Sequence, residues 1–128
     1  MYNYLYTYLL YKSFMALTIN KENILPRVKI ANTSFQQARG LMFTRKKNFN
    51  FSLVFPLKHT NRLLNSVHMC FVFYKILAVF LDCNKKVVDC KVLKPFTFYI
   101  PKRDCSYLLE LPKEFAEEIK IGDKVDWK

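Results

Sequence analysis

The stretch ILAVFLDCNKKVVDCKVL, residues 76–93, consists of two apolar runs separated by a short polar break. Residues 76–82 are apolar at consecutive positions up to Asp82, which is typical of a strand that is buried on both faces. Residues 83–85 suit a three-residue hairpin loop, because asparagine, here Asn84, tolerates left-handed backbone geometry. Residues 87–93 then return as the partner strand. This predicted hairpin indicates a β-rich core.

The remaining sequence predicts further strands on both sides of this hairpin. A second apolar run, residues 64–73, precedes the hairpin directly and also predicts a strand that is buried on both faces. The others are short apolar or alternating segments, bounded by proline or by turn-forming residues. They are residues 27–31, 51–55, 107–111 and 124–127.

Two short helices are predicted. Gln36 follows Thr33 by three residues, which is the spacing of a capping box, so a helix is expected over about residues 34–41 with Gly40 near its end. A second helix is expected to begin at Pro112, since proline is favoured in the first turn. These elements predict a mainly β (α+β) fold. We expect a compact, partly open β-barrel or rolled sheet of about seven strands with one or two short helices.

The chain length of 128 residues and the hydrophobic fraction of 52% fit one compact domain, which we expect over residues 15–128. Residues 1–14, MYNYLYTYLLYKSF, are rich in tyrosine and carry no basic region ahead of their apolar stretch. They therefore match neither a signal peptide nor a membrane span. We expect them to be a non-native or disordered N-terminal extension, with Met15 as the natural start.

The chain carries a strong excess of positive charge. Twenty-one Lys and Arg against 10 Asp and Glu give a formal net charge of +11, which attracts polyanions such as nucleic acids. Phe96, Phe98 and Tyr99 lie between Lys94 and Lys102, and aromatic rings flanked by cations are typical of single-strand binding. The same alternation also fits a strand that buries one face, and a lysine-rich surface can serve solubility alone. A polyanion and a protein partner both stay open.

The four cysteines, Cys70, Cys83, Cys90 and Cys105, form no C-x-x-C pair and stand at no finger-like spacing from a histidine. We therefore expect no metal site, no cofactor and reduced thiols in a cytoplasmic protein. A disulfide between Cys83 and Cys90 across the predicted hairpin is the alternative. The apolar run over residues 67–81 is too short for a membrane-spanning helix, which needs about 20 residues, so we expect no transmembrane segment.

A series of short motifs in order resembles one known family. They are Arg39-Gly40-Leu41-Met42-Phe43, the run over residues 67–82, Lys86-Val87-Val88, Lys94-Pro95-Phe96, Leu109-Glu110-Leu111-Pro112 and Ile121-Gly122-Asp123-Lys124-Val125. The sequence is similar over about residues 27–127 to domain-of-unknown-function family 192 (DUF 192), and to its archaeal members in particular. The resemblance implies a compact mainly β domain with a short helix, and no established biochemical activity.

The candidate ligand-binding residues are Arg39, His68, Asp82, Lys94 and Asp123. His68 and Asp82 lie on neighbouring predicted strands and could form the acid–base pair of a hydrolase-like enzyme. The alternative is a core histidine and an aspartate that begins a turn. The sequence contains no nucleophile-elbow, phosphate-loop or zinc-protease motif, so we assign no catalytic residue. We therefore expect a non-catalytic binding or interaction module, with single-stranded nucleic-acid binding and hydrolase-like activity as the alternatives.

If Met15 is the natural start, protein purified from its native source will yield no peptide N-terminal to Met15. Mass spectrometry of the intact protein and of its proteolytic peptides measures this. A recovered peptide that contains any of residues 1–14 would contradict the prediction.

Overall fold

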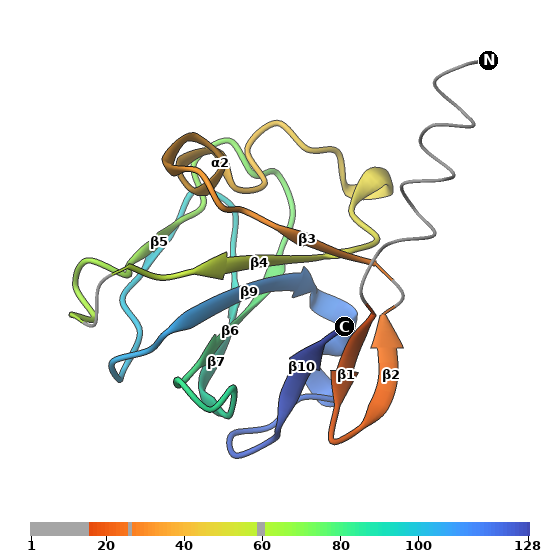
Figure 1. The fold of residues 1–128 in the computed structure, drawn as a ribbon. Coiled ribbons are helices and arrows are strands. Elements are labelled where there is room, and N and C mark those ends of the chain that lie inside the picture. Colours follow the sequence, from red (N-terminus) through yellow and green to blue (C-terminus); the bar gives the residue numbers. More distant parts are fainter. Residues whose placement is uncertain (1–15, 26, 59–60) are drawn as a thin grey trace.

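The computed structural model describes residues 16–25, 27–58 and 61–128 (Figure 1). The predicted extension over residues 1–14 and the predicted start at Met15 lie outside these residues. The described chain forms ten strands, one short α-helix and two 3₁₀-helices. They are β1 (Leu17–Ile19), β2 (Glu22–Leu25), β3 (Val28–Ile30), α2 (Ser34–Arg39), η1 (Lys46–Asn48), β4 (Ser52–Pro56), β5 (Val67–His68), β6 (Ile76–Leu81), β7 (Val87–Leu93), β8 (Phe98–Tyr99), β9 (Tyr107–Pro112), η2 (Lys113–Glu117) and β10 (Val125–Trp127).

A five-stranded sheet, ordered β3-β4-β9-β6-β7, forms the centre of the fold. β3 and β4 are parallel and are connected through α2, whereas the other neighbours are antiparallel. The predicted hairpin over residues 76–93 is confirmed as β6 and β7. The sheet is rolled and open, with β3 and β7 at its edges, so the mainly β prediction is confirmed in its rolled-sheet form.

A hydrophobic core lies on each face of this sheet. On one face, Phe80 and Leu108 pack against the segments that precede β4 and β6. On the other face, Val79 and Leu109 pack against β1, β2, β10 and the segment around η2. All six residues of β6 are buried, which confirms the prediction of a strand covered on both faces.

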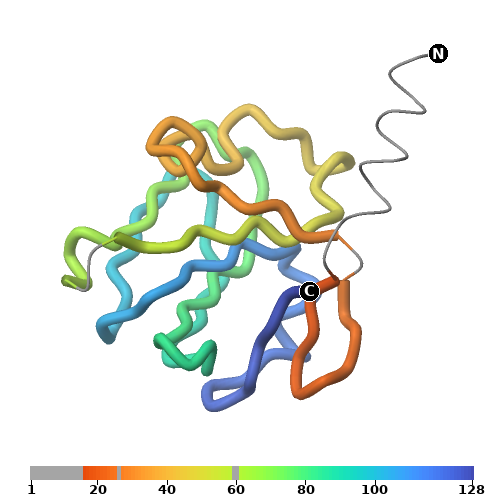
Figure 2. The backbone as a smooth tube through the Cα atoms, viewed as in Figure 1, coloured from red at the N-terminus to blue at the C-terminus, as the bar shows by residue number. Residues whose placement is uncertain are grey.

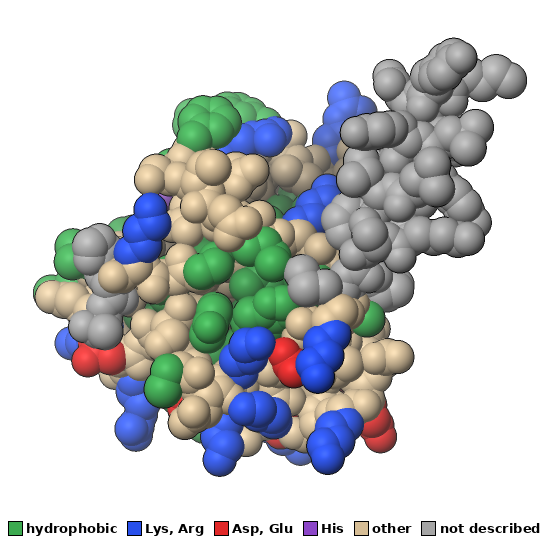
Figure 3. Space-filling model, in the orientation of Figure 1, with side chains coloured by type: hydrophobic (Ala, Val, Ile, Leu, Met, Phe, Trp, Pro, Cys, Tyr) green, Lys and Arg blue, Asp and Glu red, His purple; other side chains and the backbone are tan. Residues whose placement is uncertain are grey.

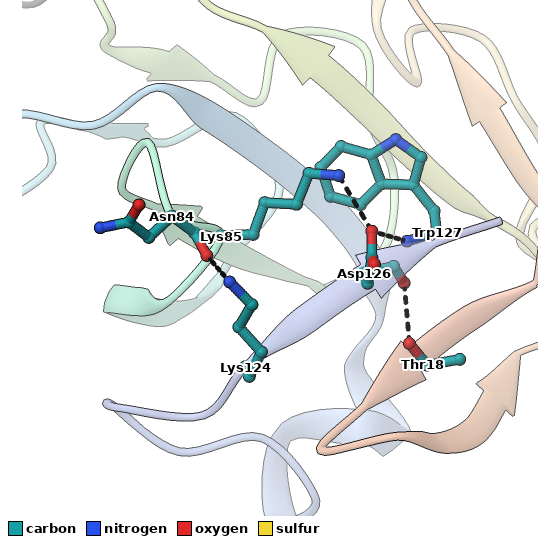
Figure 4. Close-up of polar contacts among 6 residues, drawn as sticks. All are labelled: Thr18, Asn84, Lys85, Lys124, Asp126 and Trp127. Carbon is teal, nitrogen blue, oxygen red and sulfur yellow. Dashed lines mark hydrogen bonds and ion pairs between the residues drawn. The ribbon is translucent and has the colours of Figure 1, made fainter.

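A three-stranded sheet, β10-β1-β2, covers the second face and pairs the C-terminal strand with the first described strand. Figure 2 shows the C terminus lying beside the start of the described chain. Lys85 in the β6–β7 turn fixes this sheet: its Nζ lies 2.9 Å from Asp126 Oδ1 and 4.2 Å from the ring centroid of Trp127 (Figure 4). The hydrogen bond from Lys85 lowers the pKa of Asp126.

Helix α2 has the predicted capping box. The Thr33 hydroxyl accepts a hydrogen bond from the Gln36 amide, and the Gln36 side chain accepts one from the Thr33 amide. Gly40 ends the helix at a φ of 49°, where a side chain would be strained. The helix buries none of its own residues. Hydrogen bonds from Gln37 Nε2 to the carbonyls of Ala31 and Pro56 hold it to the ends of β3 and β4 instead.

Two local predictions were wrong. Residues 64–73 form a strand only at Val67–His68, and the rest of the run is turn in which Phe71 and Phe73 are exposed. The left-handed residue of the β6–β7 turn is Lys85 rather than Asn84. In both cases contacts distant in sequence outweigh a weak local preference. The helix predicted to begin at Pro112 is present as the 3₁₀-helix η2.

The four cysteines are unpaired in the described chain. Cys105 is buried, and burial raises the pKa of its thiol to about 11. Cys70 is exposed, so the prediction that residues 64–73 are buried on both faces is wrong for this side chain too. Within the described ranges, no helix has the length and apolar character needed to span a membrane.

Replacing the fully buried Leu109 tests the role of β9 at the centre of the sheet. We expect Leu109→Ala to lower the free energy of unfolding by about 2–5 kcal/mol, because it leaves a cavity between close-packed layers. Urea denaturation measures this. The control is Leu63→Ala at an exposed leucine, which should change stability by less than about 0.5 kcal/mol. Equal losses in the two variants would contradict the assignment.

Candidate functional site

A pocket of about 230 Å³ lies between α2, the sheet and the segment that leads into β5. Polar and apolar side chains contribute about equally to its walls. We call it the Glu110 pocket. Its principal lining residues are Gln37, Arg39, Gly40, Leu41, Phe55, Asn65, Val67, His68, Val72, Leu108 and Glu110.

Glu110 is a buried acidic residue among those that line the pocket. Its side chain is 5% exposed, and within the described chain its carboxyl group has no hydrogen-bond or ion-pair partner. Burial raises the pKa of Glu110 to about 8 from its ordinary value of 4.5. At neutral pH the group is therefore mainly a neutral acid, which donates one hydrogen bond and accepts others.

The register of the sheet fixes where this carboxyl group lies. Glu110 is opposite Leu53 on β4 and Ala78 on β6. Side chains alternate along a strand, so Glu110 shares its face with Leu108, which belongs to the core beneath α2. Gly40 closes over it: a Cβ atom built at Gly40 would lie 3.6 Å from Glu110 Oε1. The end of α2 therefore lies directly against the acid.

Tyr74 carries a second unpartnered polar group in the same core. Its hydroxyl is buried and has no hydrogen-bond partner among the described residues. Burial, with the negative charge of Glu110 as a further cause, raises the pKa of Tyr74 to about 12. Buried polar groups without partners are costly, and they are concentrated at sites that serve function. Among the described residues, the hydroxyls of Ser52 and Tyr74 are such groups, and Tyr74 belongs to the core beneath α2.

His68 lines the pocket, but both of its ring nitrogens are engaged. Nδ1 accepts a hydrogen bond from the Cys70 amide at 3.3 Å, and Nε2 lies 3.2 Å from the Ala38 carbonyl oxygen. Because a carbonyl only accepts, Nε2 carries the proton and Nδ1 is the acceptor. His68 thus ties β5 to α2.

Arg39 is the last residue of α2 and borders the Glu110 pocket on one side and a second hollow on the other. It is exposed, and within the described residues its guanidinium group forms no ion pair or hydrogen bond. Arginine presents several donors in a plane that matches carboxylate or phosphate oxygens. The pocket thus combines a free cation at its rim with a neutral acid at its floor.

The structure brings only two of the five predicted site residues together, since Arg39 and His68 line one pocket. Asp82 accepts hydrogen bonds from the amides of Asn84 and Lys86 and so caps the β6–β7 turn. Asp123 accepts from the Lys120 amide and from Asn20 Nδ2. These two aspartates, and Lys94 at the start of the β7–β8 loop, do not line the Glu110 pocket.

Sequence reasoning did not select Glu110 as a site residue. A signal was present: a carboxylate stands between Leu109 and Leu111 in a predicted strand, where a buried charge is disfavoured. The predicted strand over residues 107–111 is confirmed. Residues 41–72 supply much of the cover on the face that Glu110 shares with Leu108, however, and that contact is not encoded in the strand itself.

The comparisons with known proteins place the chain in one family. The DUF192 family, described as "Uncharacterized ACR", matches residues 15–127, so the chain belongs to it. A UPF0127 protein of Thermococcus sibiricus is 43% identical over 104 residues, which cover 80% of this chain and 66% of that relative. The chain thus spans slightly less than two thirds of that relative. A UPF0127 protein of Pyrococcus horikoshii is 40% identical, with 78% and 86% coverage.

A solved structure shares the fold. The crystal structure of a protein of unknown function from Novosphingobium aromaticivorans matches with a TM-score of 0.74 and 22% sequence identity. The match covers 89% of this chain and 85% of that one. The resemblance to archaeal members of the family is confirmed by the Thermococcus and Pyrococcus relatives.

The raised pKa of Glu110 predicts a specific dependence of stability on pH. The folded protein holds a proton that the unfolded chain releases above pH 4.5, so the free energy of unfolding falls as the pH rises towards 8. We expect wild type to lose about 4 kcal/mol more than Glu110→Gln between about pH 5 and about pH 9. Urea denaturation of both proteins measures the difference. Parallel stability curves would contradict the burial of an ionisable acid here.

Proposed function

We propose that this protein is a non-catalytic binding module that holds a small organic anion in the Glu110 pocket. The observation that carries the proposal is the buried carboxyl group of Glu110, which lines the pocket and lacks a partner in the described chain. A ligand oxygen placed there would accept its proton and satisfy the group. A buried carboxyl group without a hydrogen-bond partner lowers the stability of the folded protein. A ligand that accepts a hydrogen bond from Glu110 would offset this loss.

Charge favours an anion over a cation. Arg39 supplies a free guanidinium group at the rim, and the whole chain carries a net charge of +11. An approaching cation would meet this field and would need Glu110 to ionise first. An anion instead gains charge-assisted hydrogen bonds from Arg39 while Glu110 keeps its proton.

The state of His68 supports binding rather than catalysis. A general base must have a free lone pair within reach of a substrate proton. In His68 the acceptor nitrogen already binds the Cys70 amide, and the protonated nitrogen faces the Ala38 carbonyl. Asp82, the predicted partner of His68, is used in the β6–β7 turn. The hydrolase-like alternative therefore lacks its acid–base pair.

The size of the pocket limits the ligand. Its volume of about 230 Å³ is below the range of about 300–1,000 Å³ that is typical of drug-sized ligand sites. The apolar walls, formed by residues such as Leu41, Phe55 and Val72, suit a short hydrocarbon portion. We infer a small carboxylate or phosphate compound with a second oxygen acceptor.

Titration of the ¹⁵N-labelled protein with acetate, glycolate, pyruvate and inorganic phosphate, followed by NMR, tests this function. We expect at least one of these anions to shift the amide signals of residues 37–42 and 65–68. Arg39→Gln should weaken that binding by about 10-fold or more, because a hydrogen bond to a charged group is removed. The matched control is Arg103→Gln, which removes the same charge at an exposed position outside the pocket.

The pH dependence separates Glu110 from simple charge attraction. Wild-type affinity should fall above about pH 8, when Glu110 becomes a carboxylate that no longer donates and repels the anion. Glu110→Gln should keep its affinity over the same range, since its amide still donates. Equal weakening by Arg39→Gln and Arg103→Gln, or affinity that rises with pH, would contradict the proposal.

A further inference from the structure

Four exposed phenylalanines lie together on the surface, and the Glu110 pocket uses none of them. We call Phe43, Phe71, Phe73 and Phe96 the phenylalanine platform; their exposed fractions run from 46% to 65%. Phe43 stacks on Phe71 with ring centroids 5.0 Å apart, and Phe96 contacts both Phe71 and Phe73 through ring edges. The rings come from three separate segments, so the fold assembles the platform.

The backbone beneath the platform is held in an unfavourable conformation. Phe43, Phe71 and Phe96 have φ values of 62°, 57° and 58°, in the left-handed region that bulky residues rarely adopt. Hydrogen bonds between segments hold these positions. The Phe43 amide donates to the Phe71 carbonyl, and the Phe96 amide donates to the Met69 carbonyl. The surrounding structure holds the backbone in this strained conformation, and the rings at these positions are exposed. Strained positions of this kind are concentrated at binding sites, so we interpret the exposed rings as a contact surface.

Cations border the platform on the side of η1. A surface hollow of about 450 Å³ is lined by Phe43, Phe73 and Tyr74 together with Arg45 and Lys46. None of its lining residues is acidic. Lys94, exposed at the start of the loop that carries Phe96, adds another positive charge. Figure 3 shows hydrophobic side chains protruding at the top of the molecule, near α2, with Lys and Arg side chains beside them.

We propose that the phenylalanine platform and its basic border bind single-stranded nucleic acid. The hollow has apolar aromatic walls and a cationic edge, which match the two parts of a nucleotide: a flat base and a phosphate. Bases stack on aromatic side chains without strong sequence preference, and Lys and Arg neutralise the backbone.

Other occupants fit these features less well. A second copy of this chain would bring another net charge of +11 against the basic border. A bilayer favours rings that protrude into it, whereas Phe43 and Phe73 also form the walls of a hollow. Phe98 on β8 is a further exposed ring, two residues after Phe96. Successive bases along one strand would each stack on one of these neighbouring rings.

The test is fluorescence anisotropy of a labelled oligouridylate of about twelve nucleotides, a length within the site sizes known for single-strand binders. We expect saturable binding that weakens as salt rises from about 50 to about 200 mM. Phe73→Ala should lower affinity about 10-fold, which corresponds to the loss of one stacked base. The full chain is used, and thermal unfolding checks that each variant is folded.

Two matched controls make the experiment specific. Phe35→Ala removes a phenylalanine that is 77% exposed on α2 and outside the platform, so it should leave affinity unchanged. The double variant Arg45→Ala and Lys46→Ala should reduce the slope of log affinity against log salt by about 0.7 for each phosphate that is no longer neutralised. The double variant Lys86→Ala and Lys120→Ala removes the same charge at exposed positions outside the hollow, and it should leave the slope nearly unchanged.

Three outcomes would overturn the proposal. The first is no binding of the oligouridylate at low salt. The second is equal loss of affinity in the Phe73→Ala and Phe35→Ala variants. Binding would then arise from general charge attraction and not from stacking on the platform. The third is stronger binding to phosphatidylserine vesicles than to the oligouridylate, with the vesicle binding abolished in Phe73→Ala, which would assign the platform to a membrane surface.

Discussion

Strands β6 and β9 are paired, and both faces of the pair are excluded from water. The arrangement of the other elements depends on this burial. A strand pair covered on both faces cannot stand at the surface, so the chain must supply two covering layers. The β10-β1-β2 sheet and the η2 segment form one. Loops, rather than a further sheet, form most of the other, and they carry the functional features. Segments 41–51 and 67–74 cover the core beneath α2, and each also carries part of the phenylalanine platform.

The two sites differ in the kind of chemistry they offer. The Glu110 pocket is small and partly apolar, with Arg39 as a free cation and one acid, Glu110, whose pKa is raised by burial. The platform is open to solvent, and its rings contact one another above a basic border. A small anion in the Glu110 pocket and a polyanionic strand on the platform would each lie beside positive charge. Arg39 supplies this charge at the pocket, and Arg45 and Lys46 supply it at the platform.

Much of the sheet could be predicted from the sequence, because local pattern and burial agree there. Residues 76–93 form their hairpin as predicted, and the capping box at Thr33 starts α2 where its spacing indicates. The β1–β2 hairpin was missed, since its turn at Asn20 and Lys21 uses two left-handed residues without a glycine signal. The strand predicted over residues 64–73 failed for a related reason: a run of apolar residues does not show which side chains face the core.

The sequence by itself determined a mainly β fold, a basic surface and the family, because composition, periodicity and ordered motifs are properties of the chain alone. Only the tertiary structure decided which polar residues meet. It separated His68 from Asp82, placed Arg39 and the buried Glu110 in the lining of one pocket, and brought together phenylalanines from three segments. The physical reason is that burial and contact depend on what covers each strand face. That covering comes from loops whose conformations are fixed by distant packing rather than by local preference.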